Sequence, residues 1–362
     1  MIALGPATRG ELGGELDMSS ATVTRLVVPL IKRGIIRVLD DDGSDYRIGK
    51  PAYRLGIVPS CATFIGLKVT DSKSFGVVVD MSGAVLRRGE SSLGCDSPED
   101  VVSILADQIS SLSEGLGVVG VGVGVGGRVF DGRIVSSGIL GWKGVPFQKL
   151  LESRCAVAVT VSNDVNAFAQ AESWWGGGRG KRSFVLVSVG TGIGACVINQ
   201  GTVFEGEHGS AGMVGHLKVD DFGPRCESGH VGCVRGYASS TCILRQLKEH
   251  YGIDESYEDF IANAVRGHAP EHDMACHAID AIARVVSAAI AFVDPDAVLI
   301  SGEGVGLLLA FEQQLRRQID AYRHWNGPAV EIELREMEFS SWAQGAAAAA
   351  MERWTQVHLS RA

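Results

Sequence analysis

Four residues with metal-binding side chains lie close together between positions 216 and 233: His216, Cys226, His230 and Cys233. Thiolates and imidazoles are the ligands that structural Zn²⁺ prefers, and compact spacing in a glycine-rich segment lets one ion collect them. Two buried thiols beside a surface histidine would give the same pattern. The residue types therefore predict either a zinc site or an ordinary cluster of reduced cysteines.

Two further segments have residue types suited to a phosphate- and sugar-binding cleft. Asn163 and Asp164 follow the apolar run 156–161, at the end of an expected strand, where α/β proteins usually bind ligands. Asp164 could act as a general base toward a hydroxyl, and it would serve equally well as a helix N-cap. The turn Gly190-Thr191-Gly192-Ile193-Gly194 could direct backbone N–H groups at a phosphate, although a plain hairpin turn has the same composition.

A pair of short helices is expected near the start of the chain. Segment 11–16 predicts the first, and Ser19 and Ser20 are good N-caps for the second. Apolar side chains then recur at helical spacing and define one face: Val23, Leu26, Val27, Leu30 and Ile31. Two helices joined by a tight turn, the second presenting polar residues and an arginine at its start, are typical of a helix-turn-helix.

A β-hairpin is expected after this helix pair. Segment 35–39 predicts one strand, 40–45 an acidic turn and 46–48 a returning strand, which together would form a wing. The same elements could simply cover the surface of a larger domain. Two features weigh against DNA binding: Pro29 lies inside the second helix, where a proline costs roughly 3 kcal/mol, and phosphate would repel the acidic turn.

Charge distribution separates the first sixty residues from the rest. The 362-residue chain has a net charge of −9, but residues 1–60 contain 8 Lys+Arg and 7 Asp+Glu, so the acidic excess lies beyond them. We see no apolar stretch of about 18 residues that would span a bilayer and no secretory signal. Eight cysteines in such a chain indicate reduced thiols or a metal site rather than a disulfide framework. The sequence therefore predicts a cytoplasmic protein with no membrane partner.

From residue 61 onward, apolar strand-like runs alternate with helical patterns. Strands are expected at 63–69, 75–80, 84–88 and 118–125, with a helix over 98–112. A similar order recurs at 184–189, 195–199 and 202–204, followed by a helix over 273–292, a strand at 297–301 and an alanine-rich helix over 341–357. Two related α/β halves facing a cleft are typical of proteins that close around a ligand.

The chain resembles the ROK family (repressors, open reading frames and kinases), most closely its NagC/XylR-type regulator branch. The similar segments occur in the family's order: 20–26, 49–52, 163–167, 189–195, 209–216 and 226–239. The resemblance implies an α/β protein with an N-terminal winged helix-turn-helix followed by a two-lobed actin-like (sugar kinase/ASKHA) domain. The implied domains are a DNA-binding domain at 1–60, lobe 1 at 61–165, and lobe 2 at 166–362 with the C-terminal helix returning to lobe 1.

The resemblance and the patterns together assign expected site residues. The expected DNA-binding residues are Ser20, Thr22, Thr24, Arg25 and Lys50. The expected ligand-binding residues are Asn163, Asp164, Met213, His216 and Arg235. The expected phosphate-loop residues are Gly190, Thr191, Gly192 and Gly194. The expected zinc ligands are His216, Cys226 and Cys233, with Ser228 or His230 as a fourth.

Departures from the family pattern argue against catalysis. The family's kinases have Asp-x-Gly-Gly-Thr where this chain reads Lys68-Val69-Thr70-Asp71-Ser72. A lysine cannot hold Mg²⁺, and side chains in place of glycine block the approach of phosphate. We therefore expect no requirement for ATP or Mg²⁺ and regard Asp164 as a vestigial base.

Other departures affect the sugar and zinc segments. Met213 and Arg235 each replace a family glutamate, and Ser228 replaces a cysteine of the zinc loop, which weakens the expected zinc site. Arg235 is expected either to pair with Asp164 or to bind an anionic ligand through its planar guanidinium.

These observations predict a non-catalytic transcriptional regulator. Its expected partners are operator DNA, a sugar or sugar-phosphate effector, and further copies of itself in a homodimer or homotetramer. The alternative from another class is an ATP-dependent sugar kinase that uses Asp164 as general base. A third possibility is a regulator that senses no ligand and represses constitutively.

Overall fold

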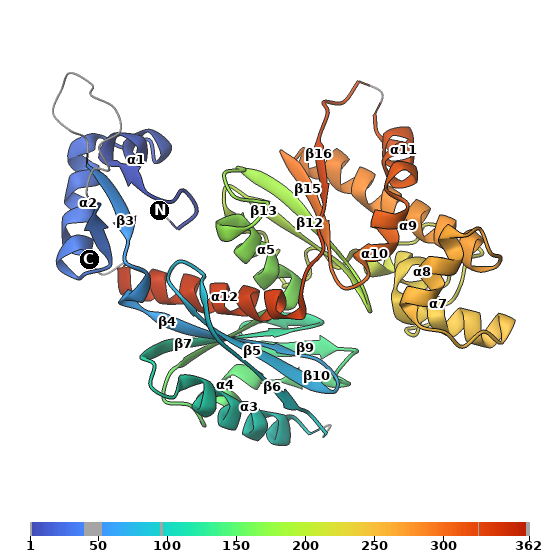
Figure 1. Ribbon diagram of the computed structural model, residues 1–362, viewed down its shortest axis with the longest axis horizontal. Coiled ribbons are helices and arrows are strands. Elements are labelled where there is room, and N and C mark those ends of the chain that lie inside the picture. The colour runs from blue at the N-terminus through green and yellow to red at the C-terminus, as the bar shows by residue number, and fades with distance from the viewer. Residues whose placement is uncertain (1, 40–52, 95–96, 325, 360–362) are drawn as a thin grey trace. The chain divides into compact units, whose positions relative to one another are not determined.

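The computed structural model describes residues 2–39, 53–94, 97–324 and 326–359 and divides the chain into two compact units (Figure 1). Unit 1 comprises Met1–Gly180 and Ser340–Ala362, and unit 2 comprises Lys181–Phe339. This division differs from the expected boundary at residue 165, because helix α5 (Asp164–Trp175) packs against the sheet of unit 1. Residues 1–60 also belong to unit 1.

The N-terminal head consists of two helices and a small sheet. Its elements are β1 (Ala7–Thr8), α1 (Arg9–Glu15), α2 (Ser20–Lys32), β2 (Ile36–Val38) and β3 (Arg54–Ile57). A capping box between Thr8 and Glu11 begins α1, and the Ser19 hydroxyl caps α2 by accepting from the Thr22 N–H at 3.2 Å. The predicted helix pair is confirmed. β3 pairs antiparallel with β1 and β2, whereas the predicted turn and strand over 40–48 lie outside the described residues.

The packing of α2 differs in part from its predicted apolar face. Val23 and Val27 are buried in the head core together with Leu55, but Leu26 is 52% exposed. The helix runs through Pro29 without ending there, since its last residue is Lys32. Pro29, which weighed against DNA binding, is therefore accommodated within the final turn of the helix.

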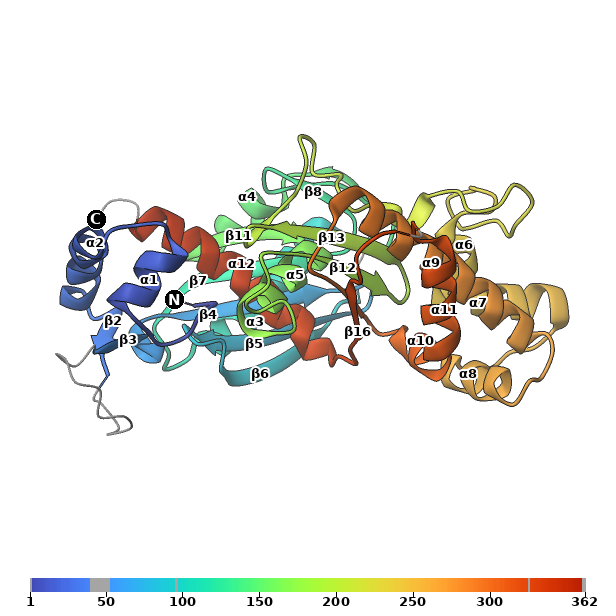
Figure 2. The same ribbon diagram turned by 90° about the horizontal axis from the view of Figure 1, so that it is seen from above.

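The body of unit 1 is built on a five-stranded sheet in the order β11-β7-β4-β5-β6. Its strands are β4 (Thr63–Val69), β5 (Lys73–Asp80), β6 (Val85–Ser92), β7 (Val118–Val125) and β11 (Ala158–Asn163). Helices α3 (Pro98–Ser113) and α4 (Phe147–Glu152) cover one face, and α12 (Phe339–Leu359) crosses the other (Figures 1 and 2). The sequence did not predict a small antiparallel sheet of β8 (Arg128–Phe130), β9 (Arg133–Ser137) and β10 (Trp142–Val145).

Two glycines let the backbone of α12 lie directly on this sheet. A Cβ atom on Gly66 of β4 would lie 1.8 Å from the Ala343 carbonyl oxygen, and one on Gly122 of β7 would lie 1.7 Å from that of Ala346. No real side chain fits at such a distance. The alanine-rich helix and the glycines in the strands therefore form one close-packed contact.

Unit 2 has a second five-stranded sheet, in the order β14-β13-β12-β15-β16. Its strands are β12 (Ser183–Val189), β13 (Ile193–Asn199), β14 (Thr202–Val203), β15 (Ala297–Ser301) and β16 (Glu331–Leu334). Its helices are η2 (Val214–His216), α6 (Val234–Ala238), α7 (Ser240–Gln246), η3 (Leu247–Tyr251), α8 (Tyr257–Val265), α9 (Glu271–Val293), α10 (Val305–Ala310) and α11 (Glu312–Tyr322).

Helix α9 corrects the expectation that no stretch is long and apolar enough to span a bilayer. By length and composition it meets that criterion. Many of its apolar side chains, including Ile279, Ile282 and Val286, are buried in the core of unit 2, whereas Phe292 near its end is 91% exposed. We therefore interpret α9 as a core helix.

Substitution of Gly66 by alanine should destabilise unit 1 selectively. The added methyl group would collide with the α12 backbone, which cannot rotate away, so the free energy of unfolding should fall by about 1–3 kcal/mol. Tryptophan fluorescence during urea unfolding measures this, because five of the six tryptophans belong to unit 1. Gly117→Ala is the control, since nothing lies within 4 Å of its Cβ position. Equal midpoints for the two variants would contradict the close contact.

Candidate functional site

The side chain expected to be a vestigial base is held in a buried ion pair. Lys68 on β4 donates from Nζ to Oδ2 of Asp164, the first residue of α5, and both residues are 7% exposed. The other carboxylate oxygen, Oδ1, accepts from the Val165 N–H at 2.9 Å. The carboxylate is therefore hydrogen-bonded through both oxygens, and the cation that the sequence placed at the Mg²⁺ position neutralises its charge.

Neighbouring residues fix this pair in place. Trp342 of α12 lies beneath Lys68, with Nζ 5.0 Å from the ring centroid, a cation–π distance. Asn163, rather than Asp164, is the N-cap of α5, because its side chain accepts from the Asn166 N–H. Its amide also donates to the Gly127 carbonyl at 2.8 Å. Asn163 thus fixes the junction of β11 and α5, where Asp164 lies.

In unit 2, the expected phosphate loop is the turn of the β12–β13 hairpin. The carboxylate of Glu303, between β15 and α10, accepts from the Thr191 N–H at 2.9 Å and from its hydroxyl at 3.1 Å. A Cβ on Gly190 would lie 2.1 Å from the Glu303 carboxyl carbon. An anionic side chain therefore occupies donors that a phosphate would need. The sequence analysis missed Glu303, although Gly302-Glu303-Gly304 after a buried strand could have indicated it.

Within unit 2, Arg235 forms an ion pair that the sequence analysis did not predict. Its Nε lies 2.9 Å from Oε2 of Glu227, and the pair lies beside the phosphate loop, since a Cβ on Gly192 would be 3.2 Å from an Arg235 nitrogen. Partial burial alone would raise the pKa of Glu227, but the hydrogen bond and charge of Arg235 lower it to about 2. The guanidinium charge is therefore balanced within unit 2 by Glu227.

The five predicted ligand-binding residues are divided between the two units. Asn163 and Asp164 belong to unit 1, whereas Met213, His216 and Arg235 belong to unit 2. Met213 precedes η2 and is 49% exposed.

The predicted metal ligands lie together in unit 2. The ligand atoms of His216, Cys226 and Cys233 all lie within 4.8 Å of one another, and both sulfurs belong to buried residues. Burial and the nearby charges of His230 and Arg235 lower the pKa of His216, which favours the neutral imidazole that metals bind. His230 Nδ1 is 3.1 Å from His216 Nδ1. The donor set fits Zn²⁺, which would hold the loop together as a structural ion.

On the head, the predicted DNA-binding residues differ in exposure. Ser20 and Arg25 are exposed, whereas Thr22 and Thr24 are half-buried. The Thr24 hydroxyl donates to the Ser20 carbonyl at 2.8 Å, so that hydroxyl already has a partner. Lys50 lies outside the described residues.

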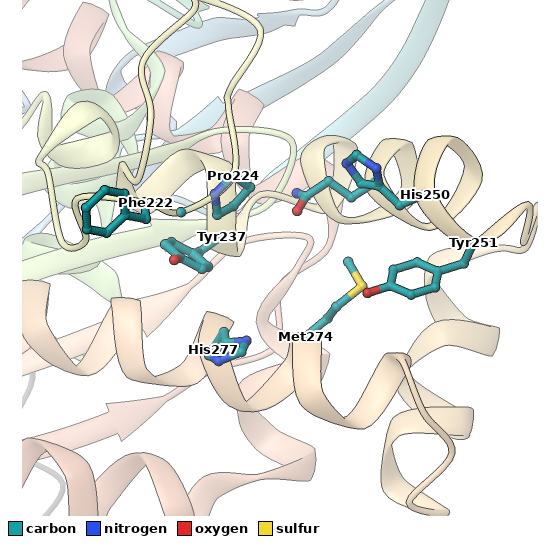
Figure 3. A pocket seen from close by; sticks show the side chains of 9 residues that line it. Phe222, Pro224, Tyr237, His250, Tyr251, Met274 and His277 are labelled. Carbon is teal, nitrogen blue, oxygen red and sulfur yellow. The ribbon is translucent and has the colours of Figure 1, made fainter.

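The segment 216–233, which contains the predicted metal ligands, is called the metal loop below. A pocket of about 360 Å³ that the sequence did not predict lies beside this loop in unit 2 (Figure 3). Phe222 and Pro224 come from that loop, and Tyr237, Met274 and His277 lie across from them. The Tyr237 hydroxyl donates to Asp220, which orders this wall of the pocket. None of the predicted ligand-binding residues lines it.

Removal of the Lys68 ammonium should leave a buried carboxylate without its counterion. We expect Lys68→Met to lower the free energy of unfolding of unit 1 by about 3–5 kcal/mol, and the double variant with Asp164→Asn to recover much of the loss. Urea unfolding followed by tryptophan fluorescence measures both. Lys73→Met is the matched control, because its ion pair with Glu90 is exposed and worth less than about 1 kcal/mol. Similar losses for Lys68→Met and Lys73→Met would show that the pair is not buried.

Comparison with known proteins places this geometry in a family. Residues 64–353 match the ROK family. A glucokinase of Thermotoga maritima is 32% identical over 247 residues, covering 62% of this chain and 77% of the glucokinase. The DNA-binding transcriptional dual regulator NagC of Escherichia coli is 26% identical over 353 residues, covering 91% of this chain and 86% of NagC.

A solved structure shows the same fold over the whole chain. It is a ROK family transcriptional regulator, a homologue of the E. coli MLC protein, with a TM-score of 0.82 and 21% identity, and the match covers 98% of this chain and 94% of that chain. Both the head and the two-lobed actin-like body are therefore included in the likeness. Because the family match spans well over half of its residues, the chain belongs to the ROK family.

Proposed function

We propose that this protein is a transcriptional regulator that binds operator DNA through its N-terminal head and senses a sugar or sugar derivative without phosphorylating it. The ion pair between Lys68 and Asp164 carries this proposal, since it neutralises the only carboxylate that the family resemblance assigns as catalytic base. The protein would act in the cytoplasm as a homodimer or homotetramer, with a palindromic operator that reflects its symmetry.

Helix α2 of the head supports a role in DNA recognition. Its first two turns present Ser20 and Arg25 to solvent, and Val23 and Val27 anchor the opposite side of the helix. A helix N-terminus also attracts phosphate through its unpaired N–H groups. We propose that α2 is the recognition helix and that Arg25 reads a base edge in the major groove.

Two internal contacts speak against the alternative of a sugar kinase. In unit 1 Lys68 neutralises the charge of Asp164, and in unit 2 the carboxylate of Glu303 occupies the Thr191 donors. The similarity to a glucokinase is explained by the shared fold and the retained Asn163-Asp164 segment. We therefore propose that no step of phosphoryl transfer is supported.

A single helix connects the expected pocket with the head, which supports a sensing role. Trp342 near the start of α12 contacts Lys68, whereas Trp354 near its end packs against the head core. Beyond it, Arg33 donates to the His358 carbonyl at 2.9 Å. We propose that a ligand at Asp164 perturbs Lys68 and Trp342 and that α12 transmits this change to the head.

Replacement of Arg25 by alanine should weaken binding to operator DNA by about 1–3 kcal/mol. Genomic fragments selected by the wild-type protein supply the operator, and affinity is measured on a selected fragment and on random duplex at one salt concentration. Arg88→Ala is the control, because Arg88 is exposed on β6, outside the head. Equal losses on both duplexes would make Arg25 a phosphate contact, and an unchanged affinity would exclude it from the interface.

No sugar should be phosphorylated at a measurable rate. ATP turnover with glucose, mannose, xylose and N-acetylglucosamine should equal that of an Asp164→Asn variant purified in parallel, because Lys68 and Glu303 occupy the groups that catalysis would need. A contaminating kinase would give the same signal in both preparations. Turnover that is present in the wild type and absent from Asp164→Asn would establish the kinase instead.

A further inference from the structure

The metal loop of unit 2 folds so that His230 returns to the side of Cys226. The Gly229 N–H donates to the Cys226 carbonyl at 2.9 Å, and the Cys226 N–H donates to the His230 carbonyl at 3.0 Å. Gly229 has a φ of +87°, which an L side chain rarely adopts, so the turn depends on glycine at this position. The turn brings the imidazole of His230 next to the buried thiol of Cys226.

Three distances in this cluster, those among His216, His230 and Cys226, agree with the edges of a tetrahedral zinc site. Bonds of about 2.0–2.1 Å to nitrogen and about 2.3 Å to sulfur give tetrahedral edges of about 3.3 Å between nitrogens and about 3.6 Å between nitrogen and sulfur. His216 Nδ1 and His230 Nδ1 are 3.1 Å apart. Cys226 Sγ is 3.8 Å from the first and 3.7 Å from the second. The three edges each lie within about 0.3 Å of the values for one bound ion.

We propose that His230 is the fourth ligand of this site, in place of the cysteine that the family loop has at position 228, and that His216, His230, Cys226 and Cys233 bind one Zn²⁺. Ser228 is an exposed residue with a neutral hydroxyl, which is a poor zinc ligand. The inference concerns the metal alone and does not depend on DNA binding.

Charge and surroundings favour this set of ligands. Two thiolates balance the charge of Zn²⁺, so the complete site is neutral, as suits residues that are 2% and 1% exposed. Cys233 Sγ also accepts from the Gly236 N–H at the start of α6, at 3.4 Å, which stabilises negative charge on the sulfur. The third cysteine of the cluster, Cys242, is instead directed to Glu227, with 3.3 Å between Sγ and the carboxylate.

The test compares matched variants of the full chain by metal content and by the spectrum of the Co²⁺-substituted protein. Wild type and Ser228→Ala should each bind one zinc and give the same tetrahedral Co²⁺ spectrum with two thiolate ligands. His230→Ala should lose zinc at a chelator concentration at least about 100-fold lower than wild type requires. Loss of a residue that only supports a ligand already costs about 10–100-fold in affinity, so loss of a ligand itself should cost at least as much. His230→Cys should keep one metal and add a third thiolate to the Co²⁺ charge-transfer absorption.

His230→Cys distinguishes loss of a ligand from a folding defect in His230→Ala, because the cysteine restores a complete ligand set. The proposal is overturned if Ser228→Ala loses zinc while His230→Ala retains it, or if His230→Cys leaves the thiolate absorption unchanged. Wild-type protein that binds no zinc in the presence of one equivalent would overturn it as well.

Discussion

The contact between the α12 backbone and the glycines of β4 and β7 is the constraint on which unit 1 depends. Because Gly66 and Gly122 have no side chains, the helix axis lies as close to the sheet as two backbones can approach. That closeness sets the position of every other residue on the helix. It brings Trp342 to Lys68 at one end and Trp354 to both the sheet and the head at the other. A shift of α12 by one side-chain thickness would disrupt both contacts together.

The chain has the ROK actin-like fold, and charged side chains of its own contact the residues that the family resemblance assigns to the site. Lys68 supplies a positive charge to Asp164, and Glu303 supplies a negative charge to the donors of Thr191. Arg235 and Glu227 form a second ion pair, beside the phosphate loop. Buried ion pairs add little net stability once desolvation is counted. Their main effect is therefore on the charge of the groups around them and not on the stability of the fold.

Much of the fold could be predicted from the sequence, because buried strands and amphipathic helices leave periodic patterns. The strands of both sheets with continuous apolar runs were found within a few residues of their bounds. By contrast, β16 (Glu331–Leu334) alternates charged and apolar residues over four positions, too few to distinguish a strand from a loop. Leu26 fits the helical period of α2, but the head is too small to bury that side of the helix.

The candidate site was predictable by residue type but not by pairing. The sequence identified Lys68 and Asp164 separately, yet their contact joins residues 96 positions apart. Glu303 reaches Thr191 over 112 positions, and the charge of a glutamate in a loop does not disclose such a partner. The partner of Arg235 likewise depended on how the loop of Glu227 folds back. Only the tertiary structure decides which opposite charges meet.

The position of α12 along the chain has a consequence for how the protein is made. Every strand of the unit 1 sheet leaves the ribosome before residue 181, whereas α12 follows the whole of unit 2. At about 5–20 residues per second, the face formed by Phe64, Val77 and Val79 remains uncovered for roughly ten seconds or more. The nascent sheet therefore exposes this apolar face to solvent during that interval. Because Trp354 completes the packing of the head, the head reaches its final rigidity only after both units have been synthesised.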